Sequence, residues 1–344
     1  MLILVWGLEA DRPAAAVLQH LREMGVPVRF IDQRDVLETE IELESGSQVS
    51  GCITICRDRI DLGDVTAVYL RPYESSLLPF IADAGPGSEA ARHASLVDDI
   101  LTIWSDLTPA FVVNPLASMS PNGSKPYQLQ QIRNLGWSVP ETLVTTDPDA
   151  ACAFWEQHGE VVYKSVSSIR SRVSRLRPEH RERFSNVSFC PTQFQRYIPG
   201  IDHRVHVVGT EVFACEVRSV ADDYRYPGEG STEIRACTLS SELEDRCRTL
   251  AAGLKLPFAG IDLRRTPEDD WVCFEVNPSP GFTYYESATG LPIAQAVARL
   301  LVNPPATPAP CQTALEQKAG HPLNRELVKM LTSAWRNGDV LQPL

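Results

Sequence analysis

Three oxygen-bearing side chains lie near residue 270 of the sequence, in an order that suits a magnesium site. Asp262 follows one short apolar run, and Glu275 and Asn277 lie within and just after the next. Mg²⁺ prefers hard oxygen ligands and is usually bound by one or two carboxylates together with waters and substrate phosphates. We therefore expect Asp262, Glu275 and Asn277 to hold a magnesium ion that is shared with ATP.

The flanking residues decide between this interpretation and ordinary surface acids. Residues 259–263 and 271–276 read as strands, and turn-forming residues lie between them. Taken alone, either carboxylate would more simply be a structural residue at a strand end. Strict alternation along the second strand predicts two faces, one with Val272, Phe274 and Val276 and the other with Trp271, Cys273, Glu275 and Asn277.

Composition and charge exclude several kinds of protein. The 344 residues exceed a usual single domain, and 43% hydrophobic residues can form sizeable cores. A net charge of -12 argues against nucleic acids and anionic membranes as partners. The nine cysteines lack metal-binding spacing, and neither a membrane span nor a signal peptide is apparent, so we expect a cytoplasmic protein.

The first third of the chain predicts alternating strands and helices. Residues 2–6 and 26–31 read as strands, and the helix between them is capped by Asp11 and ended by Gly25. This order is typical of a doubly wound parallel sheet, although no Gly-x-Gly-x-x-Gly fingerprint follows the first strand. The sequence thus predicts an α/β module without the usual dinucleotide site.

The same module contains two candidate substrate residues. Residues 40–62 predict a short antiparallel excursion, after which residues 65–70 return as a strand that ends at Arg71. Ligands of open α/β sheets bind outside the carboxyl ends of the strands. We therefore expect Arg71 and the nearby Tyr73 to lie at a substrate site.

The middle of the chain predicts a small α+β unit followed by a basic stretch. A helix is expected from Ser124 to Asn134, and strands 139–145 and 161–164 flank a second helix at 149–158. The stretch could be a solvated helix face or a mobile loop that binds anions, and its serine-rich start favours the loop. From Lys164 to Arg183 it contains seven basic residues against two acidic ones: Lys164, Arg170, Arg172, Arg175, Arg177, Arg181 and Arg183.

The last third predicts further strands and helices. A hairpin that turns at Gly209 is expected within residues 202–217. Ser241, with Glu244 three residues later, is typical of a capping box that opens the next helix. A proline-rich linker precedes one expected tail helix at 324–335.

With these pieces in order, the chain resembles the ATP-grasp superfamily, specifically RimK-type peptide ligases and the related maturases that crosslink ribosomal peptides, the graspetides. The resemblance covers about residues 115 to 302. It is carried by five short segments in the right order, namely Gln195 to Gly200, Asp202 to Val205, Asp223 to Arg225, Gly260 to Asp262 and Phe274 to Gly281.

The resemblance implies an α/β and α+β fold, in which a Rossmann-like domain precedes a two-subdomain ATP-grasp. The implied divisions are a Rossmann-like domain at 1–116, a lid subdomain at 117–192, a subdomain with the magnesium site at 193–302, and a linker with a tail helix at 303–344. The family's loop after the second lysine is rich in glycine, whereas residues 165–172 contain none. Serine and arginine side chains would have to replace backbone contacts to phosphate there.

The resemblance also implies roles for individual residues. Lys125 and Lys164 look like the lysines that face the phosphates, and Arg204 and Arg225 look like the groups that stabilise the transferred phosphoryl, with Lys164 also catalytic. The nucleotide would be bound by Gln195, Arg196, Tyr197 and Ile198 at the adenine, by Asp202 at the ribose, and by Asp223. Candidate substrate contacts besides Arg71 and Tyr73 are Arg170, Arg172, Ser279, Gly281, Tyr284 and Tyr285. His203 and His206 are expected to be ordinary strand histidines.

These implications predict an ATP-dependent ligase that activates a carboxylate as an acyl phosphate, which an amine or hydroxyl then captures. A peptide or protein substrate is expected, with ATP and two magnesium ions, or Mn²⁺ in their place. A small amino-acid or dipeptide ligase and a non-catalytic nucleotide-binding regulator stay open as alternatives. A homodimer is also left open.

Overall fold

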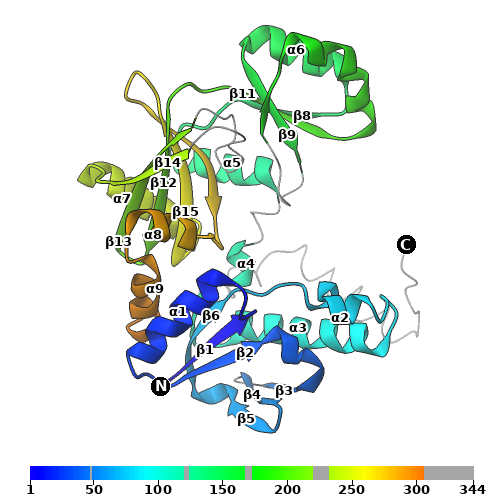
Figure 1. Ribbon diagram of the computed structural model, residues 1–344, viewed down its shortest axis with the longest axis vertical. Helices are drawn as coiled ribbons and strands as arrows, with labels where there is room; N and C mark the ends of the chain where they lie inside the picture. The colour runs from blue at the N-terminus through cyan, green and yellow to red at the C-terminus, as the bar shows by residue number, and fades with distance from the viewer. Residues whose placement is uncertain (47–48, 120–123, 167–172, 220–231, 306–344) are drawn as a thin grey trace, which may run out of the picture. The chain divides into compact units, whose positions relative to one another are not determined.

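The computed structural model describes residues 1–46, 49–119, 124–166, 173–219 and 232–305 (Figure 1). These residues form four sheets with helices packed against them. Over the described ranges, no helix has both the length and the apolar character that crossing a membrane requires. The tail helix predicted at 324–335 lies outside the described residues.

The opening sheet is parallel and has the strand order β2-β1-β6-β7, as the sequence predicts for a doubly wound module. Side chains of β1 alternate between its two faces. Ile3 and Val5 pack with helices α1 and α9 (Ile293–Val302), whereas Leu4 and Trp6 pack with α3. Burial on both faces explains the continuous apolar run of this strand. The elements are β1 (Leu2–Gly7), α1 (Arg12–Glu23), β2 (Val28–Asp32), β6 (Val65–Leu70), α2 (Pro79–Ala82), α3 (Glu89–Leu107), β7 (Phe111–Val113) and α4 (Leu116–Met119).

Helix α1 begins and ends where its sequence predicts. Asp11 is the N-cap residue and its Oδ2 accepts from the backbone N–H of Ala14 at 2.9 Å. Gly25 follows the helix with a φ of 68°, which favours glycine. The predicted excursion is the antiparallel sheet β3 (Thr39–Ser45), β4 (Val49–Ile55) and β5 (Asp58–Asp61), beside the 3₁₀ turns Gln33–Glu38, Leu62–Asp64 and Ser75–Leu77.

A second small sheet has the order β10-β9-β11-β8. Its β11 is antiparallel to both neighbours, and Phe194 on one face packs with α6 residues and Phe184. The opposite face presents Lys164 and Gln195, because their register partners Gln193 and Val162 lie on that side. The elements are α5 (Lys125–Asn134), β8 (Thr142–Thr145), α6 (Pro148–His158), β9 (Val161–Ser165), β10 (Ser174–Arg175), a 3₁₀ segment (Pro178–Phe189) and β11 (Thr192–Arg196).

The largest sheet has the order β14-β13-β12-β15-β16 and is antiparallel throughout. The hairpin predicted at Gly209 is confirmed between β12 and β13. The capping box predicted at Ser241 is wrong by one residue, because Ser240 is the N-cap and its Oγ accepts from the N–H of Leu243. The elements are β12 (Ile201–Val208), β13 (Glu211–Ser219), β14 (Thr232–Cys237), α7 (Ser241–Gly253), β15 (Phe258–Arg265), β16 (Trp271–Asn277), α8 (Thr283–Thr289) and α9 (Ile293–Val302).

Strand β16 departs from the strict alternation that its sequence predicts. Asp262 pairs with Glu275 and Leu263 pairs with Cys273, so Phe274 is an extra residue without a partner. Such a bulge shifts the side chains that follow it to the other face. Cys273 is therefore fully buried in the core rather than beside Glu275 and Asn277.

Candidate functional site

A cavity of about 380 Å³ lies where the small sheet faces the large antiparallel sheet. Charged and polar side chains make up most of its lining, which suits a charged ligand. It gathers most of the residues that the sequence predicts for the site, namely Lys125, Lys164, Gln195, Arg196, Tyr197, Ile198, Asp202, Arg204, Asp262, Glu275, Asn277, Gly281, Tyr284 and Tyr285.

The three predicted metal ligands lie at neighbouring positions of this cavity. Asp262 and Glu275 are directly opposite each other on β15 and β16, and Asn277 pairs with Gly260 two residues along. Two carboxylates and one amide oxygen are hard donors, which fits Mg²⁺. Across the described ranges, no group of three or more His, Cys, Asp or Glu side chains that could hold a metal ion is present.

Basic side chains lie directly against these carboxylates. Arg204 Nη1 donates to Asp262 Oδ1 at 2.7 Å, and Lys125 Nζ lies 3.9 Å from Glu275 Oε2. Lys164 is buried in the same cavity, with 8% of its surface exposed. Cations and carboxylates at this range balance each other, and the set can accommodate both a metal ion and the negative charge of a polyphosphate.

The segment predicted to bind adenine lines the cavity, but two of its backbone donors are used within the protein. The N–H of Arg196 donates to the carbonyl of Glu141, and the N–H of Tyr197 donates to the carbonyl of Glu160. Both bonds are 2.9 Å long. In this structure those two groups are therefore not donors for a nucleotide.

Arg264 is a residue of this site that sequence reasoning missed. Its Nε and Nη2 donate to the two carboxylate oxygens of Asp202, at 2.7 and 2.9 Å. Its Nη1 donates to the carbonyl of Ile198 at 2.8 Å. Since Asp202 and Ile198 both line the cavity, Arg264 fixes two of the predicted nucleotide contacts at once. Its strand position two residues after Asp262 is a signal that could have suggested it.

The side-chain amides of Gln128 and Asn114 bind backbone groups next to the predicted metal ligands. The Gln128 side chain donates to the carbonyl of Val276 and accepts from its N–H, at 2.7 and 3.1 Å. Asn114 donates to the carbonyls of Phe258 and Pro278 and accepts from the N–H of Phe258. Both side chains are buried, so the strand residues on either side of Asn277 are fixed by amide groups far away in the sequence.

His206 lies beneath Arg204 and is completely buried. Its Nε2 lies 3.4 Å from Arg204 Nε, and its ring contacts Tyr285 edge-on. Burial and, secondly, the Arg204 charge hold the pKa of His206 well below 6.5. Burial also lowers the pKa of His203. Both rings are therefore neutral at pH 7, and both belong to strand β12.

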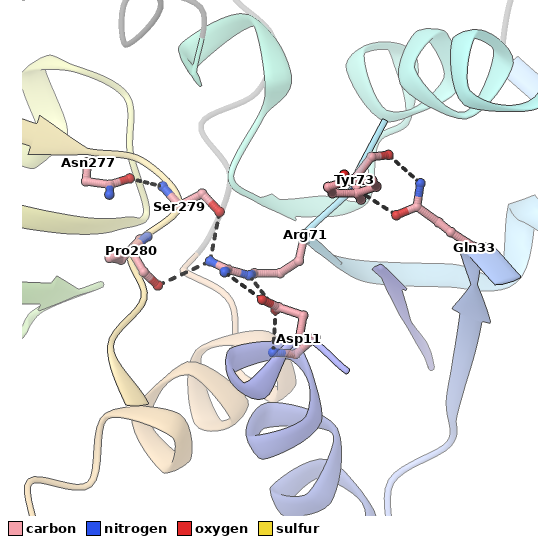
Figure 2. A network of polar contacts seen from close by, with 8 residues as sticks. Asp11, Gln33, Arg71, Tyr73, Asn277, Ser279 and Pro280 are labelled. Atoms are coloured by element: carbon pink, nitrogen blue, oxygen red, sulfur yellow. Dashed lines mark hydrogen bonds and ion pairs between the residues drawn. The ribbon is translucent and has the colours of Figure 1, made fainter. Parts of the chain in front are cut away.

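Three predicted substrate residues do not line the cavity. Figure 2 shows Arg71 beside Asp11, Ser279 and Pro280, and Tyr73 bonded through its backbone to Gln33. Ser279 instead accepts from Arg71 and donates its N–H to Asn277 Oδ1. The remaining predicted residues Arg170, Arg172, Asp223 and Arg225 lie outside the described part of the chain.

Comparisons with known proteins agree with this geometry. A family model described as "RimK-like ATP-grasp domain" matches residues 129–301. The macrocyclase MdnC from Microcystis aeruginosa, solved with precursor peptide MdnA, is 27% identical with a TM-score of 0.74 over 88% of this chain and 100% of that one. The ATP-grasp ligase PsnB, solved with a phosphomimetic variant of its minimal precursor, Mg and ADP, is 26% identical with a TM-score of 0.73 over 87% of this chain and 97% of that one.

A curated relative is named "Probable alpha-L-glutamate ligase" and comes from Xylella fastidiosa. It is 31% identical over 137 residues, which is 40% of this chain and 43% of the relative. The match thus spans less than half of that protein's length. The similarity to MdnC and PsnB, in contrast, extends over nearly all of those chains.

Proposed function

Because the chain belongs to the RimK-like ATP-grasp family, we propose that it is an ATP-dependent ligase acting on a peptide or protein. The ATP-grasp resemblance and the fold class predicted from the sequence are confirmed by the family match and the structural neighbours. The single observation that carries the proposal is the cavity in which Lys125, Lys164 and Arg204 meet Asp262, Glu275 and Asn277.

The proposed reaction has two steps. A substrate carboxylate oxygen attacks the γ-phosphorus of ATP, the bond from that phosphorus to the bridging oxygen breaks, and ADP leaves. An amine or hydroxyl then attacks the acyl carbon of the acyl phosphate, loses its proton and expels inorganic phosphate. Such chemistry depends mainly on positioning and charge neutralisation, and it needs no nucleophile from the protein.

Residues of the cavity have separate parts in this proposal. Lys164 and Arg204 bind phosphate oxygens and balance the charge that develops during transfer, and Arg225, outside the described residues, is proposed to assist them. Lys125 binds phosphate from the side of Glu275. Gln195, Arg196, Tyr197, Ile198 and Asp202 hold the nucleoside, and Asp223 is assigned to the nucleotide from the sequence alone.

The family uses ATP and Mg²⁺, and the donor set of Asp262, Glu275 and Asn277 fits that ion. When bound by these residues, the metal would neutralise negative charge on the phosphates and so favour phosphoryl transfer. Two ions rather than one, with Mn²⁺ able to replace Mg²⁺, are part of the proposal. Arg204 on one carboxylate and Lys125 near the other hold these ligands in place before a metal arrives.

The choice of a peptide substrate is supported by the two structural neighbours that were solved with precursor peptides. Gly281, Tyr284 and Tyr285 line the same cavity after the metal ligands and are proposed to contact the acceptor side. Tyr284 is 53% exposed and can meet an incoming peptide. The alternative of a small amino-acid ligase is supported by the name of the Xylella fastidiosa relative.

The same proposal includes domain boundaries at residues 116, 192 and 302. It also includes a homodimer and a reduced, cytoplasmic environment. The eight cysteines in the described residues are all free, which suits such an environment.

Leu96, Ile103 and Leu107 share one face of α3 and are each at least half exposed, which supports pairing of two chains. Ile103→Lys should then give a monomer by light scattering.

The test of the ligase proposal combines ADP release with mass spectrometry of the peptide. Peptides encoded by any short open reading frames beside the gene are tested as precursors, and free glutamate with an amine serves as the small-substrate arm. We expect ADP release and loss of water from one peptide. ADP release with free amino acids and no peptide change would favour the alternative ligase, and nucleotide binding without turnover in either arm would favour a regulator.

A further inference from the structure

Four residues connect the first helix of the chain to a proposed metal ligand. Asp11 caps α1 and Arg71 follows β6, while Asn277 ends β16 and Ser279 lies in the loop after it (Figure 2). None of the first three lines the cavity. Their contacts, however, lead to the Asn277 side chain, which does.

Arg71 donates four hydrogen bonds along this chain. Its Nε and Nη2 donate to Asp11 Oδ2 and Oδ1 at 2.8 and 3.0 Å. Its Nη1 donates to Ser279 Oγ at 2.8 Å and to the carbonyl of Pro280 at 3.1 Å. With 11% of its side chain exposed, Arg71 has all three guanidinium nitrogens engaged with the protein.

The contacts of Arg71 fix the position of Ser279, which in turn bonds to Asn277. The Ser279 N–H donates to Asn277 Oδ1 at 2.9 Å. A backbone N–H needs an acceptor, so this bond identifies the oxygen of the carboxamide and sets its orientation. An amide oxygen has two lone pairs, and the second stays available to a cation. Whether oxygen or NH₂ faces the metal site thus depends on the position of Ser279.

Resting on the proposed function, in which Asn277 binds the metal, we propose that Arg71 is a positioning residue for that ligand. It acts through Ser279 and Pro280 and does not touch the substrate. Asp11 holds the guanidinium by a two-point ion pair, whose planar geometry a lysine cannot reproduce. Outer partners that orient metal ligands commonly control metal affinity, with losses of about 10- to 100-fold when they are removed.

The test measures binding of ADP to the full-length chain by calorimetry, once with saturating Mg²⁺ and once with EDTA. Arg71→Gln should weaken ADP binding in Mg²⁺ by roughly tenfold or more and leave ADP binding in EDTA within about twofold of the wild type. Arg71→Lys should recover only part of the loss. Ser279→Ala, which leaves the Arg71 to Asp11 pair intact, should show a smaller loss in the same direction.

The matched control is Arg248→Gln. Arg248 also donates to a backbone carbonyl, that of Thr210, and pairs with two acids, Glu244 and Asp245, but it lies away from the cavity. Arg248→Gln should leave ADP binding unchanged both in Mg²⁺ and in EDTA. If Arg71→Gln does not fold, Ser279→Ala and Arg71→Lys carry the test.

The outcomes separate this inference from the proposed function. A wild type whose ADP binding is the same in Mg²⁺ and in EDTA would remove the metal site and with it the proposed function. A wild type that responds to Mg²⁺, beside Arg71 and Ser279 variants with the same response, would overturn only the positioning role. A variant that loses ADP binding equally in both conditions would overturn it as well, because the loss would then be general.

Discussion

Arg204 and Asp262 are direct register partners on β12 and β15, and Arg204 Nη1 donates to Asp262 Oδ1 at 2.7 Å. Arg204 is 6% exposed at its side chain, whereas Asp262 is 33% exposed and faces the cavity. The pair therefore places a fixed positive charge beside a proposed metal ligand. The same arginine also contacts the ring of Tyr285, which lines the same cavity.

Asp262→Asn should abolish Mg²⁺-dependent turnover while the chain stays folded. The amide keeps an oxygen that can accept from Arg204, but it loses the charge that attracts a metal. We expect ADP formation to fall by roughly 10²-fold or more. Circular dichroism and the melting temperature serve as the folding control. Turnover at the wild-type rate would remove Asp262 from the metal site.

Gly260→Ala should displace Arg204. A Cβ atom at position 260 would clash with Arg204 Nη2 and lie 2.7 Å from the Cβ of Pro280, so the guanidinium must move. Displacing a catalytic charge by about 1 Å can cost about 10²-fold in rate. The readout is kcat for ADP release.

The control for that change is Gly87→Ala, where a new Cβ would meet nothing within 4 Å. It should leave kcat unchanged. If both alanine variants turned over equally fast, the position of Arg204 would not be important for the reaction.

Arg264→Gln should weaken nucleotide binding more than it slows the chemical step. The change removes the two-point contact to Asp202 and the bond to the Ile198 carbonyl. Hydrogen bonds to charged groups are worth about 1.5–3 kcal/mol, so KM for ATP should rise by about tenfold or more. Arg265→Gln, in which an exposed ion pair to Asp269 is lost, should leave KM unchanged. A fall in kcat alone would contradict this role.

Asn114→Ala should destabilise the fold strongly. It leaves the N–H and carbonyl of Phe258 and the carbonyl of Pro278 without their Asn114 partner in a buried region. Each buried group left unpaired costs about 1–3 kcal/mol, so the free energy of unfolding should fall by about 3 kcal/mol or more. Urea denaturation measures it. Asn134→Ala, at an exposed site, should change stability by less than about 0.5 kcal/mol.

The protein should lose stability as the pH falls below about 6.5. His206 lies against Arg204 and the rings of Tyr285 and Phe258. Burial and, secondly, the charge of Arg204 lower its pKa. The unfolded chain therefore takes up a proton at a higher pH than the folded chain does. Above 6.5 the stability is complete, and below it each such histidine contributes a slope of about 1.4 kcal/mol per pH unit.

Urea unfolding between pH 5 and 7.5 checks this expectation. His206→Gln, which carries no titratable group, should flatten the part of the slope that His206 contributes. The lowered pKa of His203 adds a slope of the same sign, so some dependence should persist in that variant. An unchanged slope in His206→Gln would mean that the folded chain protonates this ring as readily as the unfolded chain.

Local patterns account for the elements that were predicted correctly. The Asp11 cap, the hairpin at Gly209 and the parallel opening sheet follow from residue types and periodicities within a few positions. The alternation predicted for β16 is wrong because a bulge at Phe274 depends on how β15 and β16 pair. A single sequence carries no clear signal for such an extra residue.

The sequence by itself determined which side chains could bind a metal and a phosphate, because their chemistry and strand positions are local properties. Asp262, Glu275 and Asn277 were named from those alone, whereas Lys164 and Arg204 were named from the resemblance to the ATP-grasp superfamily. The structure brings all five to one cavity. Only the tertiary structure decided which residues hold them there. Arg71 meets Ser279 across 208 positions and Gln128 meets Val276 across 148, and such partnerships depend on how separate elements pack rather than on any local pattern.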